Sequence, residues 1–214
     1  MVPLSNQRGA TLIEQLVALA LGSVMMTGLF GYFRSEVVYL RTLETKLAAM
    51  EDARGALDIL IRDIVNAGSW GSGSAPTETG AADDPDGDAD AVCNRVYVAT
   101  STRLHVQMDL NGNGSCADIE PRESIRYELT GPTSTCAGTT IIRRNGDCLI
   151  ANVVTGPSPL FTYYDATGND LGSSPNVAAI RRVRIAFSVQ LKNPDARVGG
   201  YLTTLLSSSV ELRN

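Results

Sequence analysis

An uninterrupted run of uncharged residues near the N-terminus constrains this chain most. Residues 16–33, LVALALGSVMMTGLFGYF, contain no Asp, Glu, Lys or Arg. At about 1.5 Å per residue the run spans roughly 27 Å of helix, close to the hydrocarbon thickness of a bilayer. A buried core helix is the alternative, but a core helix of this length usually carries a polar stripe. Residues 10–13, which lie before this run, are also mostly apolar. The segment therefore predicts a transmembrane helix over residues 10–33.

The residues before this run predict proteolytic processing. Residues 1–9, MVPLSNQRG, are polar, and Arg8 is their only charged residue. A secretory signal places its small-residue cleavage site after the apolar region, whereas Gly9 precedes the apolar region here. Cleavage after Gly9 would remove residues 1–9 as a leader peptide and leave Ala10 as the new N-terminus.

Glu14 is the one carboxylate within the predicted transmembrane helix. A charge in a lipid-facing helix costs about 2.5–3.5 kcal/mol at the helix centre and less near an end, so Glu14 needs a partner. The helix N-terminus supplies partial positive charge, and after cleavage the amino group of Ala10, from the same or a neighbouring chain, would supply a full charge. The alternative is that Glu14 lies at headgroup depth without a role.

Residues 8–19, RGATLIEQLVAL, resemble the processing motif of type IV prepilins. In that family a membrane aspartyl peptidase cuts after the Gly and methylates the new N-terminus, and a Glu at the fifth mature position pairs with the amine of an adjacent subunit. The resemblance implies that Gly9 is the cleavage residue, Ala10 the methylated terminus and Glu14 the assembly carboxylate. The family usually begins its mature chain with Phe, where this chain has Ala10.

Residues 34–68 predict an amphipathic continuation of the helix that ends at Gly68. One stripe of apolar residues repeats every three or four positions, interrupted only at Arg54, and comprises Phe33, Val37, Leu40, Leu43, Leu47, Met50, Leu57, Ile61 and Ile64. The other face carries Arg41, Glu44, Lys46, Glu51, Asp52, Asp58, Arg62 and Asp63. We expect the apolar stripe to dock on the chain's own head, and a coiled coil with another chain is the alternative.

Two segments in the middle of the chain could supply oxygens to Ca²⁺. Residues 69–91 form a loop rich in Gly, Ser, Pro and Asp, with alternating carboxylates at Asp84, Asp86, Asp88 and Asp90, although such a run is more often a solvated loop. Residues 109–120 satisfy the twelve-residue calcium-loop pattern, with candidate ligands Asp109, Asn111, Asn113, Ser115 and Glu120. Its flanks, residues 103–108 and 123–129, alternate like strands, so we favour a hairpin turn, and a calcium loop is the alternative.

Four cysteines, Cys93, Cys116, Cys136 and Cys148, lie in the part of the chain that the transmembrane helix would place outside the cytoplasm. Disulfides persist there. Because Cys136 and Cys148 bracket the Asn145-Gly146 turn, we expect them to pair and leave Cys93 with Cys116, although other pairings stay open. The sequence contains no Cys-x-x-Cys pair, so a four-cysteine zinc site is not expected.

The rest of residues 92–214 predicts an antiparallel head. Alternation indicates strands at residues 95–99, 104–108, 124–129, 139–143, 149–153, 160–164, 183–191 and 202–212. The fold class is therefore α+β, a pilin-like long helix packed on an antiparallel sheet.

Further segments resemble PilW-type minor pilins and the related J-type pseudopilins of type II secretion; they are residues 60–68, 161–165 and 210–214. The resemblance implies a low-abundance subunit that primes or caps a filament. Its expected partners are prepilin peptidase, inner-membrane lipid and other pilins or pseudopilins, and its expected location is the inner membrane with a periplasmic head. A secretion pseudopilin and a tip-displayed adhesive module are the alternatives.

Composition excludes several other functions. Eighteen Lys and Arg against 23 Asp and Glu give a net charge of −5, which argues against a nucleic-acid binder. The single histidine, His105, makes histidine-based metal and nucleophile sites hard to build. No nucleophile elbow or phosphate loop is present, so we expect no enzymatic activity.

Overall fold

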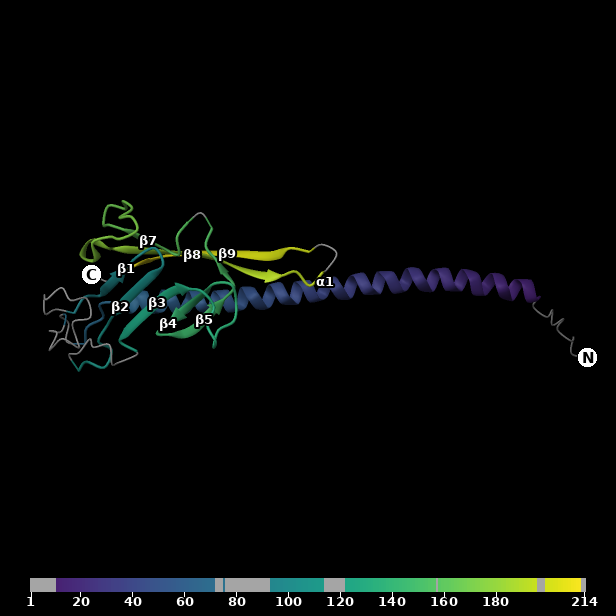
Figure 1. Ribbon diagram of the computed structural model, residues 1–214, viewed down its shortest axis with the longest axis horizontal. Coiled ribbons are helices and arrows are strands. Elements are labelled where there is room, and N and C mark those ends of the chain that lie inside the picture. Colours follow the sequence, from purple (N-terminus) through teal and green to yellow (C-terminus); the bar gives the residue numbers. More distant parts are fainter. Residues whose placement is uncertain are drawn as a thin grey trace, which may run out of the picture. The chain divides into compact units, whose positions relative to one another are not determined.

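The computed structural model describes residues 11–71, 75, 93–113, 122–156, 158–195 and 199–212. These residues form one long helix, α1 (Leu12–Asn66), followed by nine strands and a short 3-10 helix. Figure 1 shows the order of the labelled elements along the chain. The chain divides into two compact units: an N-terminal unit of residues 1–45 with 193–199, and a head unit of residues 46–192 with 200–214.

Helix α1 contains 55 residues and runs through both units. No proline interrupts it, and Leu, Ala and Met, which favour helices, are frequent in its sequence. The helix ends at Asn66, and Gly68 follows with φ of +75°, a conformation that glycine adopts without strain. The prediction of one continuous helix that stops at Gly68 is confirmed.

The first sheet of the head unit is a five-stranded antiparallel meander. Its strands follow the order of the sequence: β1 (Val96–Ala99), β2 (Arg103–Gln107), β3 (Ser124–Thr130), β4 (Ile141–Arg144) and β5 (Asp147–Ala151). The turn between β4 and β5 places Asn145 at φ of 50° and Gly146 at 91°. Asn-Gly suits this tight hairpin because both positions require positive φ.

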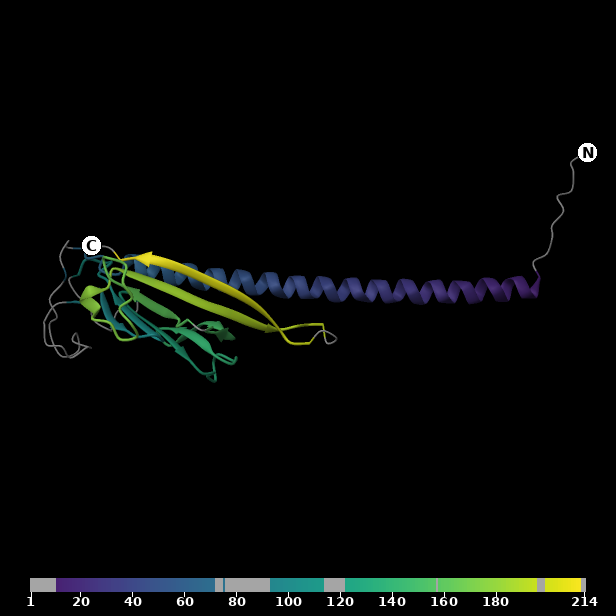
Figure 2. The same cartoon turned by 90° about the horizontal axis from the view of Figure 1, so that it is seen from above.

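The second sheet is built around β8 (Arg182–Lys192). Strands β6 (Val153–Val154) and β7 (Phe161–Tyr164) pair with it, and so does β9 (Tyr201–Glu211). A short 3-10 helix, η1 (Val177–Ala179), precedes β8. Figure 2 shows β8 and β9 side by side as a long hairpin. The predicted strands are confirmed within a few residues, and β6 is additional.

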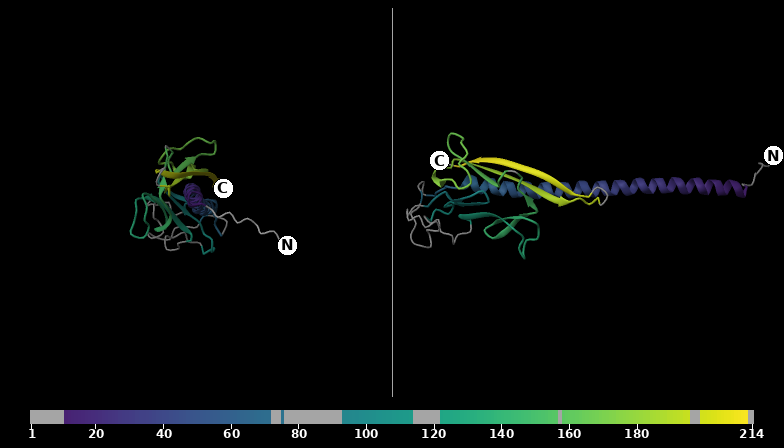
Figure 3. Two further views of the ribbon diagram at one scale, coloured as in Figure 1. Left: turned by 90° about the vertical axis from the view of Figure 1, so that its right-hand side faces the viewer. Right: turned by 45° about the horizontal axis from the view of Figure 1, so that its top comes forward.

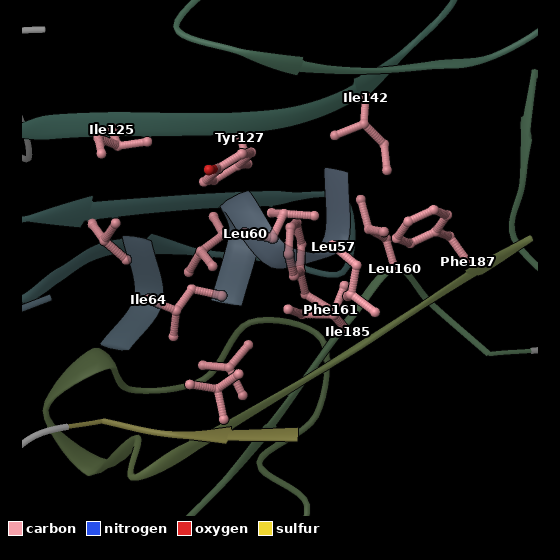
Figure 4. Packing of buried hydrophobic residues seen from close by; sticks show 14 of the residues in the cluster. Leu57, Leu60, Ile64, Ile125, Tyr127, Ile142, Leu160, Phe161, Ile185 and Phe187 are labelled. Atoms are coloured by element: carbon pink, nitrogen blue, oxygen red, sulfur yellow. The ribbon is translucent and has the colours of Figure 1, made fainter. Parts of the chain in front are cut away.

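The core of the head unit lies where the C-terminal part of α1 meets both sheets. In Figure 4, Leu57, Leu60 and Ile64 of α1 lie between side chains of the first sheet and side chains from the β7 and β8 region, which include Ile125, Tyr127, Ile142, Phe161, Ile185 and Phe187. The right-hand view in Figure 3 shows strands on two sides of the C-terminal part of α1. The α+β prediction is confirmed, with two antiparallel sheets in place of one.

The packed face of α1 differs from the predicted stripe. Of the stripe, Leu57 and Ile64 are buried, but Leu40, Leu43 and Leu47 are 52, 42 and 50% exposed. The buried face begins with small residues at Ala49, Ala53 and Ala56. Since Leu47 and Ala49 are two positions apart, they are separated by roughly 200° of helix rotation. The prediction that the whole stripe docks on the head was therefore wrong, because alanines allow the sheets to approach a different face.

Candidate functional site

The N-terminal end of α1 holds the candidate assembly carboxylate. The Glu14 backbone N–H donates to Thr11 Oγ1 at 3.4 Å, and Glu14 Oε2 accepts from the Thr11 backbone N–H at 3.5 Å. This reciprocal pair is a capping box, and the carboxylate lies where the helix dipole is positive. The Thr-x-x-Glu spacing was visible in the sequence and was missed. Gly9 and Ala10 lie outside the described residues, so their processing stays a prediction.

No residue of α1 before Ala49 is buried in the isolated chain. The helix includes an 18-residue window of mean hydropathy 1.8, none of it buried, which is long and apolar enough to cross a membrane. Two hydroxyls in this part bond within the helix: Ser23 Oγ donates to the Ala20 carbonyl and Thr27 Oγ1 to the Ser23 carbonyl, each at 2.8 Å. Because these hydroxyls are satisfied internally, the surface suits lipid or other apolar helices.

Three glycines leave room for a neighbour on the same part of α1. A Cβ built on Gly22, Gly28 or Gly31 would meet nothing within 4 Å. Small residues let helix backbones approach closely inside membranes. Further along, the leucine stripe, which we define as Val37, Leu40, Leu43 and Leu47, is also exposed. The surface around the three glycines and the leucine stripe are therefore two apolar areas of α1 that the described part of the chain does not cover.

A buried ionic network fixes the C-terminal part of α1 to the first sheet. Asp63 is only 4% exposed. Its Oδ2 accepts from Tyr127 Oη of β3 at 2.6 Å and from Arg144 Nε of β4 at 2.7 Å. The sequence placed Asp63 on the exposed face, which was wrong. The carboxylate is buried because a phenol and a guanidinium from neighbouring strands satisfy it.

The network shifts the pKa of both partners of Asp63. Burial and the Asp63 charge raise the pKa of Tyr127 well above its usual range. Burial lowers the pKa of Arg144, but the hydrogen bond and charge of Asp63 outweigh it, and the net direction is upward. The network therefore keeps Tyr127 neutral and Arg144 charged, so each can donate to Asp63.

The described part of the candidate calcium loop is organised as a turn between β2 and β3. Asp109 is buried, and its Oδ1 accepts from the Gly112 N–H at 2.7 Å, while Asn111 Oδ1 accepts from the Asn113 N–H at 2.8 Å. Glu123, which the sequence did not single out, accepts from the N–H groups of residues 110 and 111 at 2.8 and 2.9 Å. These backbone bonds support the turn interpretation.

The remaining candidate ligands, Ser115 and Glu120, lie outside the described residues, as do Asp84, Asp86, Asp88 and Asp90. Within the ranges that the structure describes, no three His, Cys, Asp or Glu side chains gather as a metal site. Calcium binding stays the untested alternative to the turn.

The disulfides stabilise the head. Cys136 and Cys148 are bonded, with their Cα atoms 5.7 Å apart and with a separation of 12 positions in the sequence, so this predicted pairing is confirmed. The bond ties the segment before β4 to β5. Cys93 is disulfide-bonded as well. Cys116 lies outside the described residues, and the expected pairing of Cys93 with Cys116 stays a prediction.

The loop after β7 borders a small cleft of about 370 Å³, whose lining includes Asp165, Arg181 and Arg182. Asp165 Oδ1 accepts from the backbone N–H and hydroxyl of Thr167 at 2.8 and 2.7 Å and from the N–H of Asn169 at 2.9 Å. The hydrogen bonds from Thr167 and Asn169 lower the pKa of Asp165 to about 2. Asp165, the last residue of the segment 161–165, therefore orders its own loop.

The N-terminus matches a known family model. The model of the prokaryotic N-terminal methylation motif matches residues 4–30, which include Gly9, Ala10 and Glu14. No curated protein matches the chain, and no solved structure does. The N-terminus thus carries the motif of type IV pilin-like and pseudopilin-like prepilins, which implies processing by prepilin peptidase and assembly with pilins.

Proposed function

We propose that the chain is a minor pilin that primes or caps a type IV pilus. In this proposal prepilin peptidase cuts after Gly9 and methylates Ala10, and the mature helix enters the filament from the inner membrane. Glu14 then pairs with the terminal amine of a neighbouring subunit. The observation that carries the proposal is the methylation motif over residues 4–30, joined to a helix whose first 37 residues, Leu12 to Ala48, include no buried side chain.

The electrostatics of Glu14 support its role. Between residues 11 and 33 it is the only charged side chain, and it is exposed in the isolated chain. In a filament core this carboxylate would be desolvated, at a cost of several kcal/mol unless a cation meets it. The capping box leaves the carboxylate able to accept further hydrogen bonds, so a neighbour's amine can approach while Thr11 stays bonded.

The exposed surface of α1 supports assembly through helix packing. The open positions at Gly22, Gly28 and Gly31 and the leucine stripe lie outside the packed face of the helix. A long contiguous apolar surface is rarely left exposed to water in a soluble protein. Lipid would cover the membrane-spanning segment with its three glycines before assembly. Helices of other subunits would cover this segment and the leucine stripe afterwards.

The head supports display outside the cytoplasm. Its disulfides are of the kind that persists in an oxidising compartment. With residues 1–9 cytoplasmic, a single crossing places the head in the periplasm. The PilW-type likeness of residues 60–68, 161–165 and 210–214 favours a minor subunit over a major one.

Processing is tested by producing the full chain with and without active prepilin peptidase and sequencing its N-terminus. We expect a mature chain that begins with N-methylated Ala10 only when the peptidase is present. Gly9→Val serves as the uncleaved control, and Ser5→Ala as the cleaved one. An intact Met1 beside active peptidase would contradict the proposal.

The priming role is tested by deleting the gene in a piliated host. We expect far fewer filaments per cell, restored by the wild-type chain, and only trace amounts of the protein in sheared filaments. A chain as abundant in the filament as the major subunit would contradict a minor role.

A type II secretion pseudopilin is the second candidate, because pseudopilins carry the same methylation motif. The two functions differ in the phenotype of the deletion. Loss of twitching with intact secretion supports the pilus subunit, whereas loss of secretion with intact twitching supports the pseudopilin.

A further inference from the structure

Among the described residues, strand β9 forms a long edge of the second sheet that has no strand on its outer side. Its eleven residues pair with β8 in an unbroken register from Tyr201 opposite Lys192 to Glu211 opposite Arg182. In the part of the chain that the structure describes, β8 is its only partner. Figure 2 shows β9, in yellow, as the strand at one edge of the second sheet, beside β8. The backbone N–H and C=O groups on its outer edge are therefore available to another strand.

This edge lacks the usual features that block intermolecular pairing. Native edge strands are typically short, bulged, or guarded by proline or lysine. The sequence of β9, YLTTLLSSSVE, contains no proline, glycine, lysine or arginine, and its only charge is Glu211 at the end. Tyr201 and Leu205, on one face of the strand, are 68 and 70% exposed. Cross-strand contacts with a paired strand would cover part of this apolar surface.

We infer that β9 pairs with β9 of a second copy of this chain, antiparallel, to join two heads through one continuous sheet. The inference goes beyond the proposed filament role and does not rest on it, since the edge belongs to the head alone.

Strand length favours a second copy as the occupant. Among the described strands only β8 and β9 have eleven residues, and the others have at most seven. Strand β8 already pairs with β9 on one edge and with β6 and β7 on the other. Among the described strands, the outer edge of β9 is therefore the eleven-residue edge without a partner, and the same edge in a second copy matches it in length.

Charge also favours self-pairing. In the fully overlapped antiparallel register, Leu205 faces Ser207 of the second copy and Tyr201 faces its Glu211. No like charges then lie opposite each other, and the two Glu211 carboxylates are at opposite ends of the paired strands, roughly 30 Å apart.

The test measures the mass of the full-length chain in detergent by light scattering over a range of concentrations. Three forms are compared: wild type, the Leu205→Lys/Ser207→Lys double variant, and the matched Leu205→Lys/Ser207→Glu double variant. The first double variant places lysine opposite lysine twice across the interface, whereas the second places lysine opposite glutamate twice. Both substituted positions are exposed on β9, and melting curves check that each form is folded.

We expect wild type to be a dimer, the Lys/Lys variant to associate at least tenfold more weakly, and the Lys/Glu variant to recover dimer formation. A monomeric wild type would overturn the inference. Dimers of equal strength in all three forms would also overturn it, because the transmembrane helix or another surface would then hold the copies together. A Lys/Glu variant as weak as the Lys/Lys variant would exclude this register of pairing.

Discussion

Two parts of one helix differ in what stabilises them. From Leu12 to Ala48, α1 has no buried side chain, whereas from Ala49 to Ile64 it buries Ala53, Leu60 and others between two sheets. Both parts are apolar on at least one face. The C-terminal part satisfies its apolar face within the chain. The described residues do not cover the N-terminal part, whose apolar surface lipid or other chains can cover.

The difference shows how function is divided along α1. The C-terminal part is held in a fixed position by the core and by Asp63, so it contributes to the stability of the head. The N-terminal part contributes little to that stability and is left free to pack elsewhere. Substitutions in the two parts should therefore separate stability from assembly.

The largest effect on unfolding is expected from Leu60→Ala. Leu60 is fully buried, and its truncation would leave a cavity that lowers the free energy of unfolding by about 4 kcal/mol. Urea titration of the head in the full-length chain measures this. Leu47→Ala, on the same helix but 50% exposed, is the control and should change it by less than about 0.5 kcal/mol. Similar losses for both would erase the distinction between the two parts.

Asp63→Ala should destabilise the head by about 3 kcal/mol, because it leaves Tyr127 and the half-buried Arg144 without their common acceptor. The same urea titration measures the loss. Arg62→Ala removes only an exposed arginine whose Nε lies 3.7 Å from Asp63, and should be nearly neutral. If Asp63→Ala were as mild as Arg62→Ala, the network would not fix α1 to the first sheet.

Cys136→Ser with Cys148→Ser removes a bond that closes a short loop of the head. We expect a loss of about 2–3 kcal/mol in the stability of the head. Membrane insertion and processing after Gly9 should be unchanged, since they depend on the N-terminal part. Impaired processing in this variant would show that the two parts are coupled.

The smallest effect is expected from calcium. The turn interpretation of residues 109–113 predicts equal melting temperatures in Ca²⁺ and in chelator, because Asp109 and Asn111 already accept backbone hydrogen bonds. A higher melting temperature in Ca²⁺, abolished by Glu120→Gln, would instead support the twelve-residue calcium loop.

The sequence predicted the features of the fold that depend on local periodicity. The alternation of residues 183–191 and 202–212 located β8 and β9, Asn145-Gly146 located a hairpin turn, and Gly68 located the end of α1. These signals are local because backbone conformation and side-chain alternation determine them.

Features that depend on tertiary contacts were not predictable in the same way. The docking face of α1 is defined by alanines, whose small size matters only once two sheets approach. Asp63 resembles a surface residue until Tyr127 and Arg144, 64 and 81 positions away, are placed beside it. The Thr11–Glu14 capping box was local and could have been found from its spacing.

The central claim is that Glu14 serves assembly and does more than cap its own helix. The most direct test measures how much Glu14→Gln, compared with wild type and Thr11→Ala, enters sheared filaments when all other pilins are native. Our account predicts normal processing of all three chains, an incorporation of Glu14→Gln at least tenfold below wild type, and near-normal incorporation of Thr11→Ala, which loses the cap but keeps the carboxylate. Incorporation of Glu14→Gln at the wild-type level would contradict it.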